Sequence, residues 1–279
     1  MSIKIVVDSA CDLPDDLVKE NDITIIPLYI NAGEKTYRDG IDLSRQAFYE
    51  HLPEFHPAPT TAAPGPEVFR QAYERLAREG ATQILSIHIS ISLSSLVESA
   101  RQAAALTSAV PVTVLDSQQL SMGIGFLAIA ASQAAARGCS MAEVLKLLNE
   151  KMGRTHVFAA LDTLEYLKRS GRMSRAASLL GNLLQIKPIL RMYCGSPTSE
   201  KVRTRRAANK RMVAILKSLG PVEEVALLHA NAPEKAEALL RATGDLLTGV
   251  KIVRSEISPV LGAHIGPGAV GFACVTRPQ

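Results

Sequence analysis

Hydroxyl side chains are concentrated where a strand is expected to give way to a helix. Residues 86–100 read S-I-H-I-S-I-S-L-S-S-L-V-E-S-A, and Ser94 and Ser95 fall at the expected helix start. The free N–H groups and the positive dipole end at such a position attract a carboxylate or phosphate, and a hydroxyl adds a neutral donor. Ser94 is equally suited to be an ordinary N-cap. The segment therefore indicates an anion site, a helix cap, or both in one side chain.

A proline-rich loop and a basic helix end supply two more candidate anion ligands. Residues 59–64 read P-T-T-A-A-P, from which Thr61 offers a hydroxyl, although threonines in such loops usually make local turns. Residues 167–172 read L-K-R-S-G-R, where cations complement the expected helix end. Arg172 follows a glycine, and its planar guanidinium is also suited to hold an anion in a cleft.

The densest glycine segment contains a histidine. Residues 262–271 read G-A-H-I-G-P-G-A-V-G, with four glycines in ten positions. This composition indicates unusual backbone angles or close backbone approach. His264 can donate a hydrogen bond to an anion, but a single loop histidine is more often structural or solvated.

The sequence lacks a complete motif for nucleotide, metal or acyl-transfer chemistry. Residues 266–271 fit G-x-G-x-x-G but precede a strand, and the looser match at residues 123–128 lies seven residues past its strand, so neither suits a dinucleotide fingerprint. There is no P-loop, no G-x-S-x-G and no metal-ligand spacing. Asp8, Asp116 and the serines are conceivable hydrolase groups, but no histidine is close in sequence as a base. We expect no catalytic residue, metal or cofactor.

A basic stretch marks the second half of the chain. Residues 201–222 carry seven Lys or Arg and no Asp or Glu, with a dense cluster at Arg203, Arg205, Arg206, Lys210 and Arg211. A solvated helix face is the default interpretation. Nucleic-acid contact is an alternative, although no aromatic residues are interleaved to stack on bases. A docking surface for an acidic protein fits equally well.

Strands and helices alternate through the first half, which predicts a mostly parallel, Rossmann-like sheet flanked by helices. Three strands should end in polar residues, at 8–9, 90–95 and 116–117, and these loops converge on one sheet edge if the strands are neighbours. The expected strands are 3–7, 23–30, 83–89 and 112–115. One helix is expected to begin at about residue 14, and others are expected at 44–51, 67–79, 94–107, 121–137 and 141–152. Residues 53–66 are expected to form a loop.

The second half is predicted to form another α/β lobe. A lobe boundary near residue 152 gives lobes 1–152 and 153–279. The expected elements are short segments at 157–161, 164–169, 177–180 and 187–192, a helix at 205–219, strands at 225–228 and 250–257 with a helix between them, and a last strand at 270–275.

The composition predicts an aliphatic interior in a cytoplasmic protein. Hydrophobic residues make up 47%, aromatic residues only 4%, and there is no Trp. The net charge of +4 falls well short of a nucleic-acid-binding tail. The four cysteines form no C-x-x-C pair, and we interpret them as free, buried thiols in a reducing compartment. No apolar run approaches the ~18 residues of a membrane span.

Six segments in order resemble the DegV family of bacterial fatty-acid-binding proteins, along nearly the full length of the chain. They are V-V-D-S-A-C-D-L near the start, T-A-A-P from Thr61, L-S-S from Leu93, V-L-D-S from Val114, R-S-G-R-M-S from Arg169, and G-A-H-I-G-P-G-A-V-G from Gly262.

The resemblance implies a two-lobed α/β protein with a long-chain fatty acid buried between the lobes. It implies that Thr61 and Ser94 hold the carboxylate, that Arg172 and His264 lie near the head group, and that Arg203 lies on or near a partner surface. Members hand the acid to a separate fatty acid kinase, which makes an acyl phosphate for phospholipid synthesis. The sequence itself predicts no transmembrane segment and no nucleic-acid partner, and a carrier of this kind allows transient contact with a membrane surface.

The sequence departs from the family pattern at three positions around this site. Ala62, Ser95 and Ser170 replace the usual serine, glycine and glycine, while Thr61, Ser94 and Arg172 keep the family residues. Two other functions compete with a lipid carrier: a serine hydrolase acting on acyl groups, and a nucleic-acid-binding regulator that uses the basic stretch.

Overall fold

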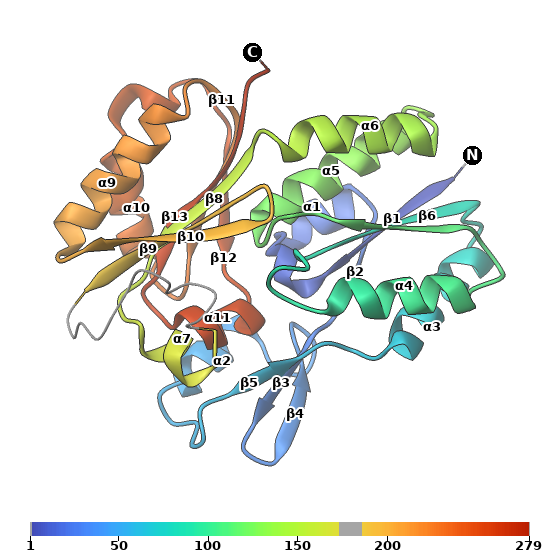
Figure 1. The fold of residues 1–279 in the computed structure, drawn as a ribbon, viewed down its shortest axis with the longest axis horizontal. Helices are drawn as coiled ribbons and strands as arrows, with labels where there is room; N and C mark the ends of the chain where they lie inside the picture. The colour runs from blue at the N-terminus through green and yellow to red at the C-terminus, as the bar shows by residue number, and fades with distance from the viewer. Residues whose placement is uncertain (1, 173–185, 279) are drawn as a thin grey trace.

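Two large β-sheets lie side by side in the computed structural model, which describes residues 2–172 and 186–278. One sheet has four strands, the other has six, and a third, small sheet has three. Figure 1 shows helix α5 (Met122–Ala136) between the two large sheets and the small sheet at one end. The α/β class expected from the sequence is confirmed.

The four-stranded sheet has the order β2-β1-β6-β7, and every pair in it is parallel. The central strand β1 is buried nearly throughout, as is typical of parallel strands covered by helices on both faces. Its strands are β1 (Ile3–Asp8), β2 (Ile23–Ile26), β6 (Gln83–His88) and β7 (Val112–Asp116), and its helices are α1 (Asp15–Glu20), α3 (Pro66–Arg78), α4 (Leu96–Leu106), α5 and α6 (Met141–Met152).

The strand expected at residues 23–30 is wrong as a single element. It is broken at Pro27, which has no N–H to donate to a ladder. After the break, β3 (Tyr29–Ala32) joins a separate antiparallel sheet with β4 (Lys35–Arg38) and β5 (Thr60–Ala62). Strand β5 lies inside the stretch expected to be only a loop, and helix α2 (Arg45–His51) precedes it.

The six-stranded sheet has the order β10-β9-β8-β13-β11-β12, and only the β11–β12 pair is parallel. Helices α9 and α10 cover its outer face (Figure 1). Its strands are β8 (Thr155–Ala160), β9 (Lys187–Tyr193), β10 (Ser196–Val202), β11 (Val222–His229), β12 (Ile252–Glu256) and β13 (Val270–Thr276), and the helices are α7 (Glu165–Arg169), α9 (Arg205–Ser218), α10 (Pro233–Arg241) and α11 (Pro259–Ile265), with short 3-10 turns η1 (Ser9–Cys11) and η2 (Gly244–Leu247). The element expected at 177–180 lies outside the described residues.

Helix α5 packs between the two large sheets, and this close packing accounts for its glycines Gly123 and Gly125. A Cβ on Gly123 would meet Val157 of β8 at 2.9 Å, and one on Gly125 would meet Leu13 at 3.1 Å. These glycines therefore permit close packing of α5, which agrees with rejecting a dinucleotide motif there.

The four cysteines are free, as expected, but they are not all buried. Cys11 and Cys274 are buried, whereas Cys139 is half-buried and Cys194 is exposed in the turn between β9 and β10. The expectation of buried thiols is wrong for Cys194, because the turn projects its side chain outward. Within the described residues, no helix is long and apolar enough to cross a membrane.

Candidate functional site

A partly open cavity of about 180 Å³ lies where the two halves of the chain meet. Its walls are almost wholly apolar and include Ile89 and Leu120 from the first half and Leu190, Met192 and Leu228 from the second. For comparison, an apolar cavity of ~150 Å³ is large enough to take up benzene and remain free of water. The space therefore suits an alkyl group.

All four residues expected to contact an anion line this one cavity. Thr61, Ser94, Arg172 and His264 come from four segments spread over more than two hundred residues. The fold brings them together because β5, the loop before α4, the end of α7 and helix α11 all border the same space.

Thr61 and His264 form a pair across the two halves of the chain. The Thr61 Oγ1 and His264 Nε2 atoms lie 2.8 Å apart. Thr61 is held in β5 opposite Ile30 of β3, and His264 lies near the end of α11. The expectation that His264 occupies a loop is wrong: Pro259 starts a short helix there, as proline commonly does at the first helical position.

His264 is a neutral imidazole near physiological pH. Burial, together with the nearby Arg172 guanidinium, lowers its pKa to about 4. Its Nδ1 atom is buried and has no hydrogen-bond partner in the described part of the chain. One ring nitrogen therefore meets Thr61, and the ring adds no positive charge of its own.

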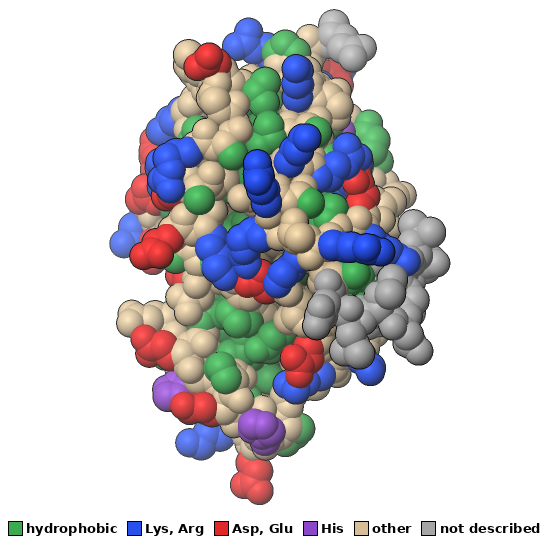
Figure 2. Space-filling view, turned by 90° about the vertical axis from the view of Figure 1, so that its left-hand side faces the viewer, with side chains coloured by type: hydrophobic (Ala, Val, Ile, Leu, Met, Phe, Trp, Pro, Cys, Tyr) green, Lys and Arg blue, Asp and Glu red, His purple; other side chains and the backbone are tan. Residues whose placement is uncertain are grey.

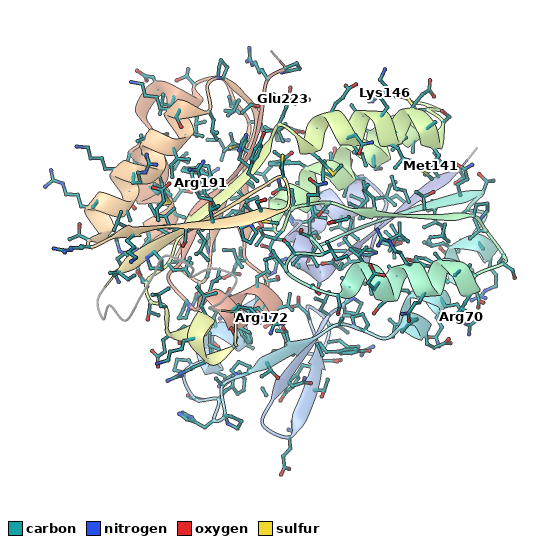
Figure 3. The ribbon with its side chains drawn as sticks, in the orientation of Figure 1. Arg70, Met141, Lys146, Arg172, Arg191 and Glu223 are labelled. Carbon is teal, nitrogen blue, oxygen red and sulfur yellow. The ribbon has the colours of Figure 1, made fainter. Side chains whose placement is uncertain are left out.

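Arg172 supplies the fixed positive charge at this end of the cavity. It lies just beyond α7 and beside α11 (Figure 3). Its Nη1 donates to the Ser170 carbonyl at 3.2 Å, and the side chain is otherwise exposed. The cationic end of the cavity therefore lies at the protein surface.

Ser94 lies two residues before the start of α4 and is half-buried. The N-cap position belongs to Ser95, whose side chain makes no capping hydrogen bond within the described residues. Ser94 Oγ instead accepts a hydrogen bond from the Leu96 N–H at 3.3 Å, so it satisfies one free donor of the helix. Its own hydroxyl proton stays available for an acceptor in the cavity.

Three glycines of the 262–271 segment allow close packing around His264. A Cβ on Gly262 would meet the Tyr49 hydroxyl at 2.5 Å, and one on Gly266, at φ +72°, would meet the Tyr166 ring at 2.1 Å. A Cβ on Gly271 would meet the Phe158 carbonyl at 2.2 Å. Only glycine lets α11 and β13 approach these neighbours, so the segment positions His264.

The three polar loops converge on one sheet edge, as expected. The Ser117 N–H donates to the His88 carbonyl at 3.0 Å, and the Ile91 and Gln118 N–H groups donate to Asp116 Oδ1 at 3.3 and 2.9 Å. The Ile89 N–H likewise donates to Asp8 Oδ2 at 2.9 Å, so both Asp8 and Asp116 hold loop backbone at this edge.

A Ser–His–Asp arrangement exists, but it is sealed inside the first half. His88 Nδ1 lies 3.1 Å from Asp8 Oδ2, and His88 Nε2 lies 2.7 Å from Ser86 Oγ, which also contacts the Tyr73 hydroxyl. Asp8, Ser86 and His88 are all fully buried. The expectation that no histidine is close in sequence is wrong, because His88 lies two residues after Ser86. Among the described residues, however, Asp8, Ser86 and His88 do not line the cavity.

Arg203 lies away from the cavity, on an exposed basic face. It precedes α9, and Figure 2 shows Lys and Arg side chains gathered over this side of the molecule. Part of the charge is internally paired, because Arg211 and Arg191 both contact Glu200. Arg203 has the exposure that a partner surface requires.

Sequence reasoning missed most of the cavity wall. Ser121, Arg191 and Thr198 are polar lining residues that no motif marked, and Arg191 projects from β9 (Figure 3). The aliphatic wall residues carry no sequence signal that separates them from ordinary core. Among the described residues, no cluster of three or more His, Cys, Asp and Glu side chains could hold a metal ion.

An aliphatic cavity whose wall includes the Thr61 and Ser94 hydroxyls, the His264 imidazole and the Arg172 guanidinium suits an amphipathic, anionic ligand. Residues 2–277 match the family model described as "Uncharacterised protein, DegV family". The chain is 34% identical over 279 residues to a DegV domain-containing protein of Streptomyces coelicolor, covering 99% of each. It is 32% identical to Protein DegV of Bacillus subtilis, covering 98% of each. The chain belongs to the DegV family.

Solved structures of family members have the same fold. DegV of Bacillus subtilis, described as a fatty acid binding protein, superposes with a TM-score of 0.90 at 31% identity, covering 99% of this chain and 100% of that one. A DegV family protein of Thermus thermophilus, described by its fatty acid binding, gives 0.88 at 31% identity with the same coverage.

Proposed function

We propose that this protein binds one long-chain fatty acid between lobes 1–152 and 153–279. The alkyl chain occupies the aliphatic cavity, and the carboxylate lies at Thr61, Ser94, Arg172 and His264. The observation that carries this proposal is the Thr61–His264 pair on the wall of a largely apolar cavity. The fatty acid binding described for the Bacillus and Thermus relatives supports it.

The chain supplies most of the affinity, and the polar end supplies orientation. Each buried methylene contributes roughly 0.8 kcal/mol, so a chain of about sixteen carbons contributes on the order of 12 kcal/mol before association costs. A hydroxyl hydrogen bond contributes about 1 kcal/mol net. Thr61 and Ser94 therefore decide which end of the ligand faces the surface rather than whether it binds.

The charges at the polar end match one ionised carboxylate. Arg172 carries a permanent positive charge, whereas the lowered pKa of His264 leaves the imidazole neutral, with a single N–H that donates to Thr61 Oγ1. The Ser94 and Thr61 hydroxyls donate without adding charge. The carboxylate is thus held but stays close to the surface and accessible to a second protein.

The bound acid is presented to a separate fatty acid kinase in the cytoplasm. The sequence has no P-loop or other nucleotide-binding motif, so the phosphoryl donor must come from a partner. The exposed Arg203 and the basic face around it suit an acidic surface of such a kinase. The product is an acyl phosphate for phospholipid synthesis, and delivery involves transient contact of the carrier with a membrane surface rather than a transmembrane segment.

Ser94→Ala tests this division of labour, with Ser95→Ala as the matched control. Ser94→Ala should bind fatty acid within about tenfold of wild type, because one hydroxyl hydrogen bond is lost. It should slow acyl-phosphate formation by the kinase far more, because the carboxylate is no longer held in place. Ser95 is exposed and should affect neither property. Equal kinase turnover by Ser94→Ala and wild type would refute the assigned role.

A further inference from the structure

Residues 255–258 form hydrogen bonds with residues of the first half of the chain. This segment comprises the end of β12 and the two residues before α11, the helix that carries His264. Its Ile257 and the following Val260 and Leu261 line the cavity. Its position therefore sets where His264 lies relative to Thr61.

Asp12 makes the most extensive of these contacts. Its Oδ1 accepts a hydrogen bond from the Ser258 N–H at 2.8 Å, and its Oδ2 accepts one from Ser121 Oγ at 2.5 Å. The Ser255 hydroxyl donates to the Asp12 carbonyl. The side chain is completely buried, and the backbone has φ 53°, a left-handed conformation that Asp tolerates better than most residues. We call Asp12 with Ser121, Ser255 and Ser258 the Asp12 clasp.

The clasp joins cavity walls that are far apart in the sequence. Ser121 lines the cavity at the start of α5, and its N–H donates to the carbonyl of Ala10, another lining residue, at 2.8 Å. Ser258 is the residue immediately before α11. One carboxylate thus fixes the walls built by η1, α5 and α11 against one another.

Two side chains of α2 form hydrogen bonds with the backbone of the same segment. Arg45 Nη1 donates to the Glu256 carbonyl at 2.7 Å, and the Tyr49 hydroxyl donates to the Ile257 carbonyl at 2.9 Å. The positive charge of Arg45 also lowers the pKa of the Asp12 carboxyl and so partly opposes the larger effect of burial, which raises it. Three consecutive residues, 256–258, are therefore held by the first half of the chain, and Asp12 holds the one at the helix start.

We propose that Asp12 is a positioning residue for the head-group site, acting through Ser258 and α11 to hold His264 against Thr61. This role rests on the proposed fatty acid site, but the Thr61–His264 contact can be examined separately from ligand binding. Asp12 itself contributes nothing to the ligand contacts, since the described cavity wall does not include it.

The test compares Asp12→Ala and Asp12→Asn by two readouts. The first is the His264 imidazole titration in the unliganded protein, followed by NMR. The second is fatty acid affinity, measured by displacement of a fluorescent acyl probe. Asp12→Ala should raise the His264 pKa from about 4 towards 6.5, because the ring is no longer held in its buried position. Fatty acid affinity should weaken roughly tenfold, the size of effect expected when one hydrogen bond to the carboxylate is lost. Asp12→Asn keeps the acceptor for Ser258 and should stay near wild type in both.

Leu239→Ala is the control for general destabilisation, because Leu239 is buried in a separate cluster on α10. It should lower the melting temperature without moving the His264 titration. Unchanged His264 and affinity in folded Asp12→Ala would overturn the proposal, as would an equal shift in Leu239→Ala. If Asp12→Ala does not fold, Ser121→Ala replaces it as the test variant, and the proposal then requires that Ser121→Ala shift the His264 NMR signals. Wild-type protein that binds no fatty acid would refute the proposed function while leaving the NMR test of the clasp intact.

Discussion

Ala159→Phe should block the cavity while leaving the fold in place. Ala159 lines the cavity from β8, on the same strand as the lining residue Val157. The substitution adds a phenyl ring to a space of about 180 Å³, and a benzene molecule already fills a cavity of ~150 Å³. Little room then remains for an alkyl chain.

The expected loss follows from the displaced methylenes. Displacing even four of them removes roughly 3 kcal/mol, which is about a 200-fold weaker Kd. The cost to the fold should be small, because the ring enters empty space rather than a packed core.

Displacement of a fluorescent acyl probe measures the affinity, and thermal unfolding checks the fold. Ala105→Phe is the matched control, since Ala105 is exposed on α4 and the same ring there should change neither property. An Ala159→Phe protein with a native melting temperature and wild-type affinity would show that the chain does not occupy this cavity.

Three further predictions concern charge. Binding of a fatty acid should raise the His264 pKa from about 4 by about one unit or more, because a carboxylate then lies beside the ring; an unchanged NMR titration would place the carboxylate elsewhere. Burial raises the pKa of Asp39 from 3.8 to about 7, so its contribution to the unfolding free energy is complete below pH 3.8 and is lost as the pH rises through about 7. Asp39→Asn should remove this decline, which denaturant titrations at several pH values would measure. If the unfolding free energies of mutant and wild type changed with pH in the same way, the prediction would be contradicted. Arg203→Glu should weaken the apparent affinity for the kinase about tenfold or more while leaving the fatty acid Kd unchanged; a normal kinase titration would exclude Arg203 from the partner surface.

The parallel sheet and the four head-group residues could be predicted because each left a local signal. Buried runs such as β1 indicate parallel strands, and polar residues after strand ends indicate a site at one sheet edge. Thr61, Ser94, Arg172 and His264 each lie in a segment of unusual composition. The roles assigned to them stay predictions, since their positions in one cavity do not by themselves identify the ligand.

The missed features depend on contacts that sequence patterns do not encode. The Asp12–Ser258 hydrogen bond joins residues 246 apart, and nothing near Asp12 marks its partner. The helix α11 was missed because its interior Gly262 is a poor helix former, and packing against Tyr49 supports it instead. The Ser258-Pro259 pair was the available signal, since a cap residue followed by proline commonly starts a helix.

The lobe boundary near residue 152 also stays a prediction, although the secondary structure is compatible with it. Helix α6 ends at Met152, and β8 of the six-stranded sheet begins at Thr155. The Asp12 clasp and the α2 contacts cross this boundary, so we expect the lobes to unfold as one cooperative unit rather than separately.

Native mass spectrometry of the freshly purified protein, followed by organic extraction, tests the central claim most directly. A cavity of this kind predicts a stoichiometric mass increase that is extracted as a single fatty acid per chain. After removal of the lipid, incubation with fatty acids should restore the same mass increase, and Ala159→Phe should not recover it. A protein that is unliganded on purification and stays so after incubation with several fatty acids would contradict the carrier function and favour the acyl-enzyme alternative.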